Sequence, residues 1–407
     1  MSLPGPAYSL RPRHLGRGAA LTVLFAAVLA TAAATGALPP GDEADAARAV
    51  RGGPSAHPAP RPAPRPGDGA VRDEVVRAAA EAAADGKSAA KAAEEVVSRS
   101  GDRWGAVYDR SEYEDYQRAL DGSYTGVGLW ARRTADGRVE VARVQDGGPA
   151  QRAGLRPGDR LRTVDGRPVR GRTAAEVVAL LRGDGPAGGA RAEAGTEVAL
   201  GVQRAARAWT VTLRRARLAA EAVTVRHVGD AVLIRVSAFT RGSGARVREA
   251  VARAPAGAGV LLDLRGNGGG LVTEAVDAAS AFLDGGLVAT YDVHGRETAL
   301  YAEPGGDTGR PVVALIDGGT MSAAELLTGA LKDRGRAVTV GARTFGKGSV
   351  QMPSSLPDGS VAELTVGHYR TPAGAVVDGR GIVPDVPAPA RAEERARAVL
   401  SGLGAGA

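Results

Sequence analysis

Two short, almost entirely apolar segments limit the fold of this chain more than any other feature. They read G-V-L-L-D-L-R at 259–265 and P-V-V-A-L-I-D at 311–317. Such runs are typical of strands in a sheet that is covered on both faces, because neither side of the strand meets water. Helix-like stretches follow both segments, from Val272 to Leu283 and after Ser322. Residues 218–390 are therefore predicted to form an α/β domain.

Composition excludes several classes of function. The 407 residues are enough for two or three domains and a sizeable core. There is no cysteine, which excludes a thiol nucleophile, disulfides and a cysteine-based zinc site. The net charge of +7 is spread along the chain, without a basic block of interleaved aromatics, so we expect no nucleic-acid partner. We also expect no metal and no cofactor.

The N-terminal part is predicted to direct the protein out of the cytoplasm. Residues 1–38 combine a basic flank with an apolar run that begins at Gly18, which predicts a transmembrane anchor or a signal peptide. Arginines before the run favour a single-pass cell-membrane protein whose remainder is extracytoplasmic. Cleavage near Ala32–Ala34 would instead give a secreted protein. Residues 39–70 are rich in Pro, Ala and Gly and are expected to be a disordered linker.

Helical patterns occupy both ends of the folded part. Residues 71–122 are predicted to be a helical region, in which Ser111 caps a helix together with Glu114. A short amphipathic helix is expected at 392–400, within a C-terminal segment 391–407 that ends in a flexible tail.

Between these parts, residues 123–217 change to an alternating, strand-like pattern. Three motifs carry a resemblance to PDZ domains: G-V-G-L at 126–129, A-G-L-R-P-G-D-R-L at 153–161 and V-D-G at 164–166. PDZ domains bind an extended peptide as an added strand. The resemblance implies that the backbone N–H groups of Gly126, Val127, Gly128 and Leu129 hold a C-terminal carboxylate. A PDZ-shaped insert that binds no peptide is the alternative.

Ser322 stands at the start of a predicted helix, in T-M-S-A-A-E-L-L. With Glu325 it forms the pattern of a capping box, and capping alone would explain both residues. A helix N-terminus also presents free N–H groups that stabilise negative charge. The amide of Ala323 can therefore supply half of an oxyanion hole for a nucleophilic serine. The glycine-rich turn at 261–270 can supply the other half, because it follows a buried strand at its C-terminal end.

Lys347 is the best candidate for the base that a nucleophilic serine needs. The sequence contains 52 basic residues, of which only four are lysine. Arginine keeps its proton in proteins, whereas a buried lysine can lose it. Glycines and apolar residues flank Lys347, and Gln351 could accept a hydrogen bond from it. His227, His294 and His368 are not in a motif that couples them to Ser322, and G-x-S-x-G is absent.

A nucleotide-binding loop is the competing interpretation of the lysine segment. Residues 341–347 match the first part of G-x-x-x-x-G-K-[ST], but Gly348 stands where a serine or threonine should hold magnesium. The residues that follow cannot form the required helix. The nucleotide interpretation is therefore set aside.

Taken together, these motifs resemble the C-terminal (tail-specific) processing peptidases. The resemblance rests on D-L-R-G-N-G-G-G-L at 263–271, the serine and lysine segments, T-P-A-G at 371–374 and G-R-G-I-V-P-D at 379–385. It implies a crotonase/ClpP-like α/β core behind a PDZ domain. It further implies Ser322 as nucleophile, Lys347 as base, Gln351 as its positioning residue, and Gly269 and Ala323 as oxyanion donors.

Two departures from the family pattern are visible. Met321 replaces the usual alanine, and Gly266 and Gly268 stand where the family often has Asn-Pro. The extra glycine predicts a looser turn beside the oxyanion hole, and leaves open which of residues 268–270 donates.

The sequence thus predicts an exported serine endopeptidase that cleaves C-terminal tails of protein substrates through an acyl-enzyme. A catalytically inactive PDZ adaptor and a non-proteolytic acyl-transferring enzyme are the alternatives. Whether the chain forms a homo-oligomer is left open.

Overall fold

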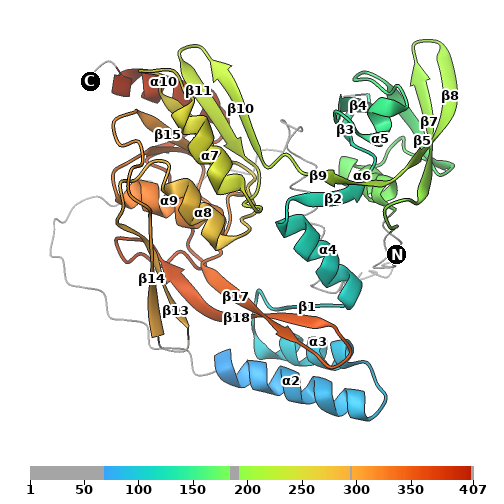
Figure 1. Ribbon diagram of the computed structural model, residues 1–407, viewed down its shortest axis with the longest axis horizontal. Helices are drawn as coiled ribbons and strands as arrows, with labels where there is room; N and C mark the ends of the chain where they lie inside the picture. The colour runs from blue at the N-terminus through green and yellow to red at the C-terminus, as the bar shows by residue number, and fades with distance from the viewer. Residues whose placement is uncertain (1–67, 135, 184–191, 294–295, 405–407) are drawn as a thin grey trace, which may run out of the picture.

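The computed structural model describes residues 68–134, 136–183, 192–293 and 296–404. These residues form an N-terminal lobe, a second lobe over the segment predicted to be a PDZ domain, called the PDZ lobe below, and a core lobe. Figure 1 shows the PDZ lobe joined to the rest through strands β2 and β9. The predicted membrane segment 1–38 lies outside the described residues. Within the described ranges, no helix is both long and apolar enough to cross a bilayer.

The N-terminal lobe combines three helices with one strand: α2 (Asp68–Ala84), α3 (Ala89–Ser100), β1 (Ala106–Tyr108) and α4 (Arg110–Leu120). Helix α2 begins at Asp68, so the predicted linker 39–70 is wrong in its last three residues. The predicted cap of α4 is also wrong, because Asp109 and not Ser111 is the N-cap. The Asp109 carboxylate accepts from the N–H of Glu112 at 2.8 Å, and the Glu112 carboxylate accepts from the N–H of Asp109 at 3.0 Å. Strand β1 ends at Tyr108, so the helix starts as soon as the chain leaves the sheet.

Ten elements form the PDZ lobe and its connection: β2 (Ser123–Gly126), β3 (Leu129–Arg133), β4 (Val139–Val144), α5 (Pro149–Arg152), β5 (Arg160–Val164), β6 (Arg167–Pro168), α6 (Ala174–Arg182), β7 (Glu197–Arg204), β8 (Arg207–Arg214) and β9 (Ala216–Ala219). Strands β3, β4, β5, β7 and β8 form an antiparallel sheet in that order, with β6 beside β5. Strands β2 and β9 pair only with each other. Gly126 thus ends β2 and Leu129 begins β3, which places the predicted carboxylate-binding residues in the link between two sheets.

The core lobe is built on a six-stranded sheet of β10 (Val223–Val228), β11 (Ala231–Val236), β12 (Val260–Asp263), β15 (Val312–Ile316), β16 (Val338–Gly341) and β19 (Val386–Pro387). All neighbouring pairs from β11 to β19 are parallel, and β10 is antiparallel to β11. Alternate residues of the central strands face opposite sides. Leu262 and Ile316 pack with the helices on one side, whereas Leu261 and Leu315 pack against the C-terminal helix on the other. Both predicted apolar strands are therefore covered on two faces.

Four helices cover this sheet: α7 (Ser243–Ala252), α8 (Val272–Ala279), α9 (Ala323–Asp333) and α10 (Ala392–Gly404). Helix α8 ends at Ala279, not at the predicted Leu283. The Ser280 hydroxyl donates to the Val276 carbonyl and accepts from the N–H of Glu303, so the chain turns there toward another segment. Helix α10 continues to Gly404 instead of ending at Leu400.

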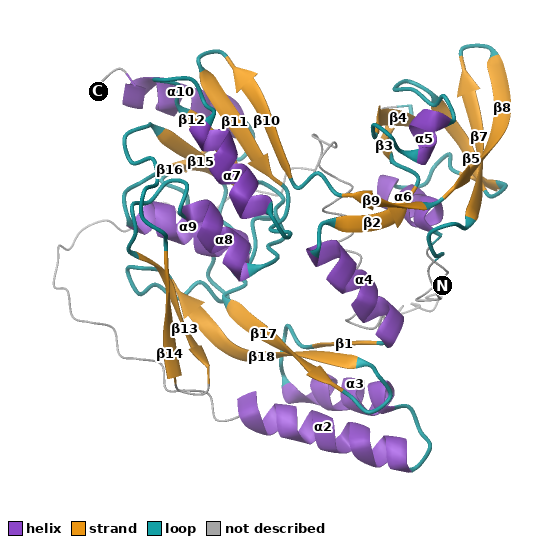
Figure 2. Cartoon of the chain, in the orientation of Figure 1, coloured by secondary structure: helices purple, strands orange, loops and turns teal. Residues whose placement is uncertain are grey.

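A second, antiparallel sheet joins the core to the N-terminal lobe. It contains β13 (Leu287–Val293), β14 (Arg296–Tyr301), β17 (Ser349–Ser355) and β18 (Val361–Arg370), together with β1. The long strand β18 pairs with β13, β17 and β1. Helices α2 and α3 pack on the far end of this sheet through Leu356, Ala362 and Leu364 (Figure 2). Residues 71–122, predicted to be only helical, therefore also contribute strand β1 to a sheet. Strand β17 of that sheet begins at Ser349, two positions after Lys347.

Candidate active site

Ser322 occupies a strained position between β15 and α9. Its backbone has φ 55° and ψ −119°, and its side chain is half-buried. Among the described non-glycine residues, Asp165 and Ala205 are the others with positive φ. Both of those lie in short connections between paired strands. A side chain in such a backbone region costs about 1–3 kcal/mol, which the surrounding structure must offset.

Hydrogen bonds from the loop before Ser322 to the glycine-rich turn provide that support. The Thr320 hydroxyl donates to the Leu264 carbonyl at 2.9 Å, and the Gly266 N–H donates to the Asp317 carboxylate at 2.8 Å. The N–H of Met321 donates to the Asn267 carbonyl at 2.9 Å. The ends of β12 and β15 are thereby fixed together, at the C-terminal edge of two neighbouring parallel strands.

Gly269 lies directly against Ser322. A Cβ atom at Gly269 would stand 2.9 Å from the Ser322 Cβ and 3.2 Å from the Ala323 nitrogen, and its φ is +98°. Only glycine fits this position without displacement. Three residues assigned to the site from the sequence, Ser322, Ala323 and Gly269, are thus brought together.

The turn beside the serine is held more firmly than its glycines suggest. Asn267 is fully buried, its side-chain amide donates to the Val236 carbonyl at 3.0 Å, and its side-chain oxygen accepts from the N–H of Gly269 at 2.9 Å. The expectation of a looser turn is wrong, because Asn267 fixes it from inside. The same bond occupies the Gly269 N–H that was expected to donate to an oxyanion.

The buried carboxylate of Glu325 connects the serine and lysine segments. One oxygen accepts from the N–H groups of Ser322 at 2.9 Å and Lys347 at 2.8 Å. The other accepts from the Thr344 hydroxyl at 2.5 Å and the Gly346 N–H at 2.7 Å. Burial raises the pKa of Glu325, while these four donors act in the opposite direction. Glu325 was expected as a helix cap, and it also fixes the lysine loop.

Lys347 lies in the loop between β16 and β17, with its side chain half-buried. Its Nζ is 5.2 Å from the centre of the Trp104 ring. Burial lowers the pKa of Lys347 from its ordinary value of 10.5, while nearby Glu363, Asp102, Asp378 and Glu325 oppose that shift. A lysine with a lowered pKa is the kind that can act as a base.

Glycines flank Lys347 because another loop passes close to its backbone. A Cβ at Gly346 would stand 2.9 Å from the Gly381 nitrogen, and one at Gly348 would stand 2.5 Å from the Asp378 nitrogen. The N–H of Gly379 donates to the Gly346 carbonyl at 2.9 Å, and the N–H of Gly348 donates to the Asp378 carboxylate at 3.2 Å. The G-R-G-I-V-P-D motif therefore supports the lysine loop from outside.

The side chains of Ser322, Lys347 and Gln351 are not hydrogen-bonded to one another among the described residues. The Gln351 amide nitrogen donates to the Ser349 hydroxyl at 2.7 Å and to the Thr365 hydroxyl at 3.4 Å. Catalytic hydrogen bonds are often long in unliganded enzymes and tighten when substrate binds. The structure thus places Gln351 on β17, close after Lys347 in sequence, with its amide directed to other partners.

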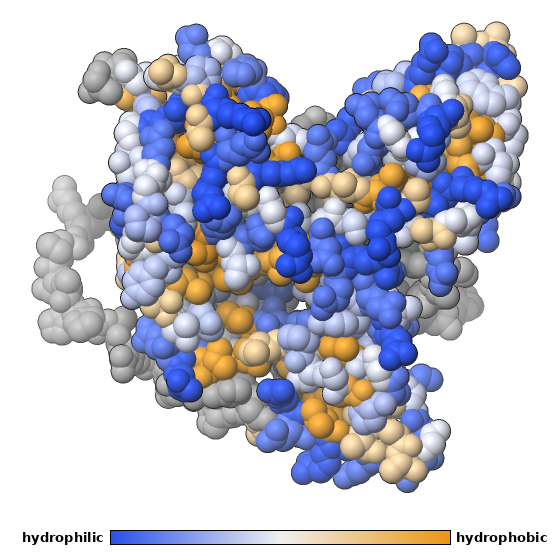
Figure 3. Space-filling model, viewed as in Figure 1, coloured by the Kyte–Doolittle hydropathy of each residue, from blue (hydrophilic) through white to orange (hydrophobic). Residues whose placement is uncertain are grey.

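The predicted peptide-binding residues lie in the PDZ lobe. Gly126, Val127, Gly128 and Leu129 line a cavity of about 320 Å³. Val178 and Leu181 of α6 supply apolar lining, and Thr224, Arg235 and Ser237 of the core lobe also contribute. Figure 3 shows the surface hollowed between these two lobes. The cavity is therefore bounded by both the PDZ domain and the core.

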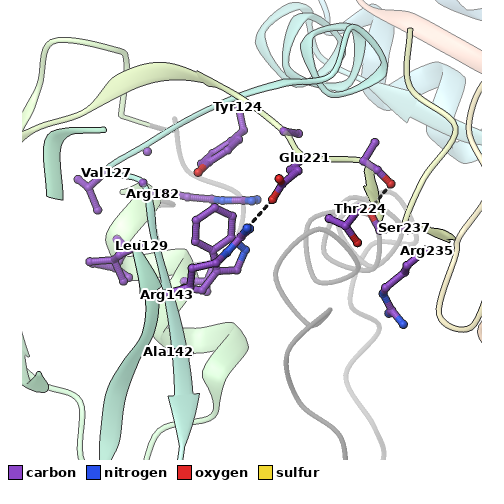
Figure 4. A pocket seen from close by; sticks show the side chains of 17 residues that line it. Tyr124, Val127, Leu129, Ala142, Arg143, Arg182, Glu221, Thr224, Arg235 and Ser237 are labelled. Atoms are coloured by element: carbon purple, nitrogen blue, oxygen red, sulfur yellow. Dashed lines mark hydrogen bonds and ion pairs between the residues drawn. The ribbon is translucent and has the colours of Figure 1, made fainter. Parts of the chain in front are cut away.

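Charged side chains line part of this cavity, among them Arg143, Arg182 and Glu221. Figure 4 shows Arg143 directed at Glu221, with which it forms an ion pair. The Arg143 guanidinium also stacks on the Trp130 ring, 3.6 Å from its centre. Arg182 lies over the Tyr124 ring at 5.6 Å.

Sequence reasoning missed three contributors to the site. In the sequence Asn267 stands out only as part of a glycine-rich turn, and its burial depends on contacts with β11 that local sequence does not reveal. Asp102 and Trp104 lie more than 200 positions before Lys347 and were assigned to a helical region. A tryptophan in a chain with only three was the one available signal.

Two family models match parts of this chain. Residues 230–388 match the family model for peptidase family S41, and residues 140–187 match that for a PDZ domain. A probable CtpA-like serine protease of Staphylococcus aureus (strain N315) is 30% identical over 301 residues, which cover 72% of this chain and 59% of that protein. The chloroplastic C-terminal processing peptidase of Tetradesmus obliquus is 37% identical over 294 residues, which cover 66% of this chain and 61% of that protein.

Among solved structures, the photosystem II D1 C-terminal processing protease is similar. It is 30% identical in sequence with a TM-score of 0.48, and the match covers 78% of this chain and 86% of that one. The chain spans about 60% of the length of the two curated relatives above.

Proposed function

Because residues 230–388 match the model of peptidase family S41 and residues 140–187 match that of a PDZ domain, we propose that this chain is a C-terminal processing peptidase. It hydrolyses peptide bonds in the C-terminal tails of protein substrates as a serine endopeptidase. The observation that carries the proposal is the Glu325 carboxylate, one oxygen of which accepts hydrogen bonds from the backbone N–H groups of both the strained Ser322 and the half-buried Lys347.

Ser322 is the nucleophile and Lys347 the base in this proposal. Neutral Lys347 takes the proton from the Ser322 hydroxyl as the oxygen attacks the scissile carbonyl. The tetrahedral intermediate then collapses, the C–N bond breaks, and the leaving amine takes the proton from Lys347. A water molecule, activated by the neutral Lys347 amine, then hydrolyses the acyl-enzyme and restores both side chains.

The oxyanion is stabilised by backbone N–H groups at the start of α9 and in the glycine-rich turn. Ala323 supplies the first donor, because it is the first residue of the helix. The second donor comes from residues 268–270. If Gly269 is that donor, its bond to Asn267 must lengthen when substrate binds. Gln351 positions Lys347 after exchanging one of its present partners for the amine.

Substrate tails bind to the PDZ domain in this proposal. The N–H groups of Gly126–Leu129 hold the terminal carboxylate, and the apolar lining formed by Val178 and Leu181 accepts an apolar last side chain. A tail seated there also reaches strands of the core lobe.

Several finer features belong to the same proposal. The six-stranded sheet with its helices is of the crotonase/ClpP-like type, which its parallel strands and site at their C-terminal edge support. Residues 1–38 hold the enzyme at the cell membrane with its catalytic part outside, or are removed to release it. A homo-oligomer is compatible with both arrangements.

Two single substitutions test the proposal on a peptide with an apolar C-terminus. We expect Ser322→Ala and Lys347→Ala each to abolish cleavage, because a nucleophile and its base act as a unit. Ser401→Ala and Lys87→Ala change the same residue types at exposed positions and should leave cleavage intact. Full activity in either site variant would rule out the mechanism. Binding of tails without cleavage by the unchanged protein would instead identify an inactive adaptor, and ester turnover alone an acyl-transferring enzyme.

A further inference from the structure

A tryptophan from the N-terminal lobe covers the lysine of the candidate site. Trp104 follows α3 in the turn that leads to β1, and the residue is 9% exposed. Its ring centre lies 5.2 Å from the Nζ of Lys347 and 5.6 Å from the ring centre of Phe345. The ring and the ammonium come from segments more than 200 residues apart, so the contact is a product of the tertiary fold.

Asp102 anchors this turn to the sheet that carries Gln351. Its carboxylate accepts from the Thr365 N–H and the Thr365 hydroxyl, both at 2.8 Å, and from the Trp104 N–H at 3.0 Å. The Thr365 hydroxyl in turn accepts from the Gln351 amide at 3.4 Å. Pairing of β1 with β18 fixes the chain directly after the turn. The position of Trp104 is therefore fixed by β18, whose Thr365 also accepts the hydrogen bond from Gln351.

We propose that Trp104 is a positioning residue for Lys347, so that the turn at 100–105 of the N-terminal lobe is a working part of the active site. This inference rests on the role of Lys347 in the proposed function. The indole ring excludes water from one side of the amine and limits where Nζ can lie. The N-terminal lobe thus does more than extend the protein.

Two effects of the ring on Lys347 have opposite signs. The ring face attracts an ammonium by about 0.5–2 kcal/mol, which favours the charged form. Its bulk removes water from the amine, which disfavours that form. Burial is the largest cause of the lowered pKa of Lys347. We therefore expect loss of the ring to raise that pKa toward its ordinary value.

Other charges around the amine come from the turn itself and from three further elements, and they set the background for this effect. Glu363 of β18, Asp102 of the turn, Asp378 of the supporting loop and Glu325 of α9 all favour the charged lysine. Arg103 also stacks on the Trp104 ring, at 4.6 Å, and opposes a second cation there. A substitution of Trp104 leaves the four carboxylates in place, so its effect reports the ring.

The scarcity of lysine permits a direct measurement on the full chain. With ¹³C-labelled lysine, only four side-chain Cε resonances arise, and the one lost in Lys347→Met identifies Lys347. In the Ser322→Ala background we expect this resonance to titrate below the ordinary lysine pKa of 10.5, because burial lowers the pKa of Lys347. In Trp104→Ala its midpoint should rise by about one pH unit, in Trp104→Leu by less, and in Trp104→Phe hardly at all. Trp209→Ala in the PDZ domain is the matched control and should leave the midpoint unchanged.

Activity supplies the second readout. A rise of about one pH unit lowers the neutral fraction of Lys347 about tenfold near neutral pH. We expect kcat to fall by that factor in Trp104→Ala, with KM unchanged, the acid limb of the pH profile shifted upward, and recovery in Trp104→Phe. An unchanged titration midpoint in a folded Trp104→Ala protein would overturn the inference, and Trp104→Leu decides the matter if the alanine variant does not fold. Since the titration needs no turnover, it separates failure of this inference from failure of the proposed peptidase activity.

Discussion

Replacing Glu325 by glutamine is the perturbation that probes the site most deeply. The carboxylate is fully buried and accepts four hydrogen bonds, two at each oxygen. Glutamine has nearly the same shape but carries an NH₂ group in place of one oxygen. In either orientation of the new amide, its NH₂ group faces two of the four groups that donated to the carboxylate. Either Ser322 and Lys347 lose their shared acceptor, or Thr344 and Gly346 lose theirs.

The magnitude follows from these two lost bonds. Leaving a buried donor unsatisfied costs about 1–3 kcal/mol, so two such groups cost about 2–6 kcal/mol. If half of this cost appears in the transition state, the activity falls roughly 5- to 150-fold, since about 1.4 kcal/mol corresponds to a factor of ten. The remainder appears as reduced stability of the folded protein.

Steady-state cleavage of a tail peptide and thermal unfolding measure the two parts separately. Glu249→Gln on α7 is the matched control, because Glu249 pairs with Arg253 at the surface and such pairs contribute little. We expect that control to match the unchanged protein in both assays. A Glu325→Gln protein with unchanged kcat and unchanged unfolding temperature would refute the view that this carboxylate fixes the site.

Three further predictions concern the base, its loop and the tail. Lys347→Arg should be inactive in cleavage assays at every pH, because arginine keeps its proton and only a deprotonated amine can accept one. The unchanged enzyme should gain kcat/KM as the pH rises through the pKa of Lys347, which burial lowers below 10.5. Activity of the arginine variant would contradict a lysine base. Gly348→Ala should lower kcat at least tenfold, because the new Cβ would stand 2.5 Å from the Asp378 nitrogen. The control Gly335→Ala, where the space is open but φ is positive, should reduce only the stability of the protein. Equal kinetics in the two variants would contradict the close approach of the loop at Asp378 to the lysine loop. Amidation of the peptide C-terminus should raise KM about tenfold or more, because it removes the charge of the carboxylate that Gly126–Leu129 are proposed to hold. Equal KM values for the free and the amidated peptide would argue against binding through the PDZ domain.

How far the sequence predicts this structure depends on how local each interaction is. The two apolar strands of the core and helix α9 were predictable, because their burial pattern and capping residues are written in neighbouring positions. Strand β1 was not, because Ala106–Tyr108 is held by pairing with β18 more than 250 residues later. The end of α8 at Ala279 likewise depends on a bond between Ser280 and the distant Glu303.

The same distinction applies to the candidate site. Ser322, Ala323 and Gly269 were assigned from motifs, and the fold brings them into contact. The spacing of Lys347 and Gln351 suggested a direct bond, but Gln351 sits at an irregular point of β17 and bonds to Ser349 and Thr365. Asn267 and Trp104 act through tertiary contacts, so no local pattern could reveal them.

Covalent labelling of Ser322 is the most direct test of whether this protein is a serine peptidase. A serine-reactive phosphonate probe, followed by mass spectrometry of the digested protein, reports whether this hydroxyl is an activated nucleophile. We expect labelling at Ser322 in the unchanged protein and none in Lys347→Arg, because the lysine must be neutral to activate the serine. Equal labelling with and without a neutral lysine, or labelling at another serine with peptide cleavage intact in Ser322→Ala, would contradict it.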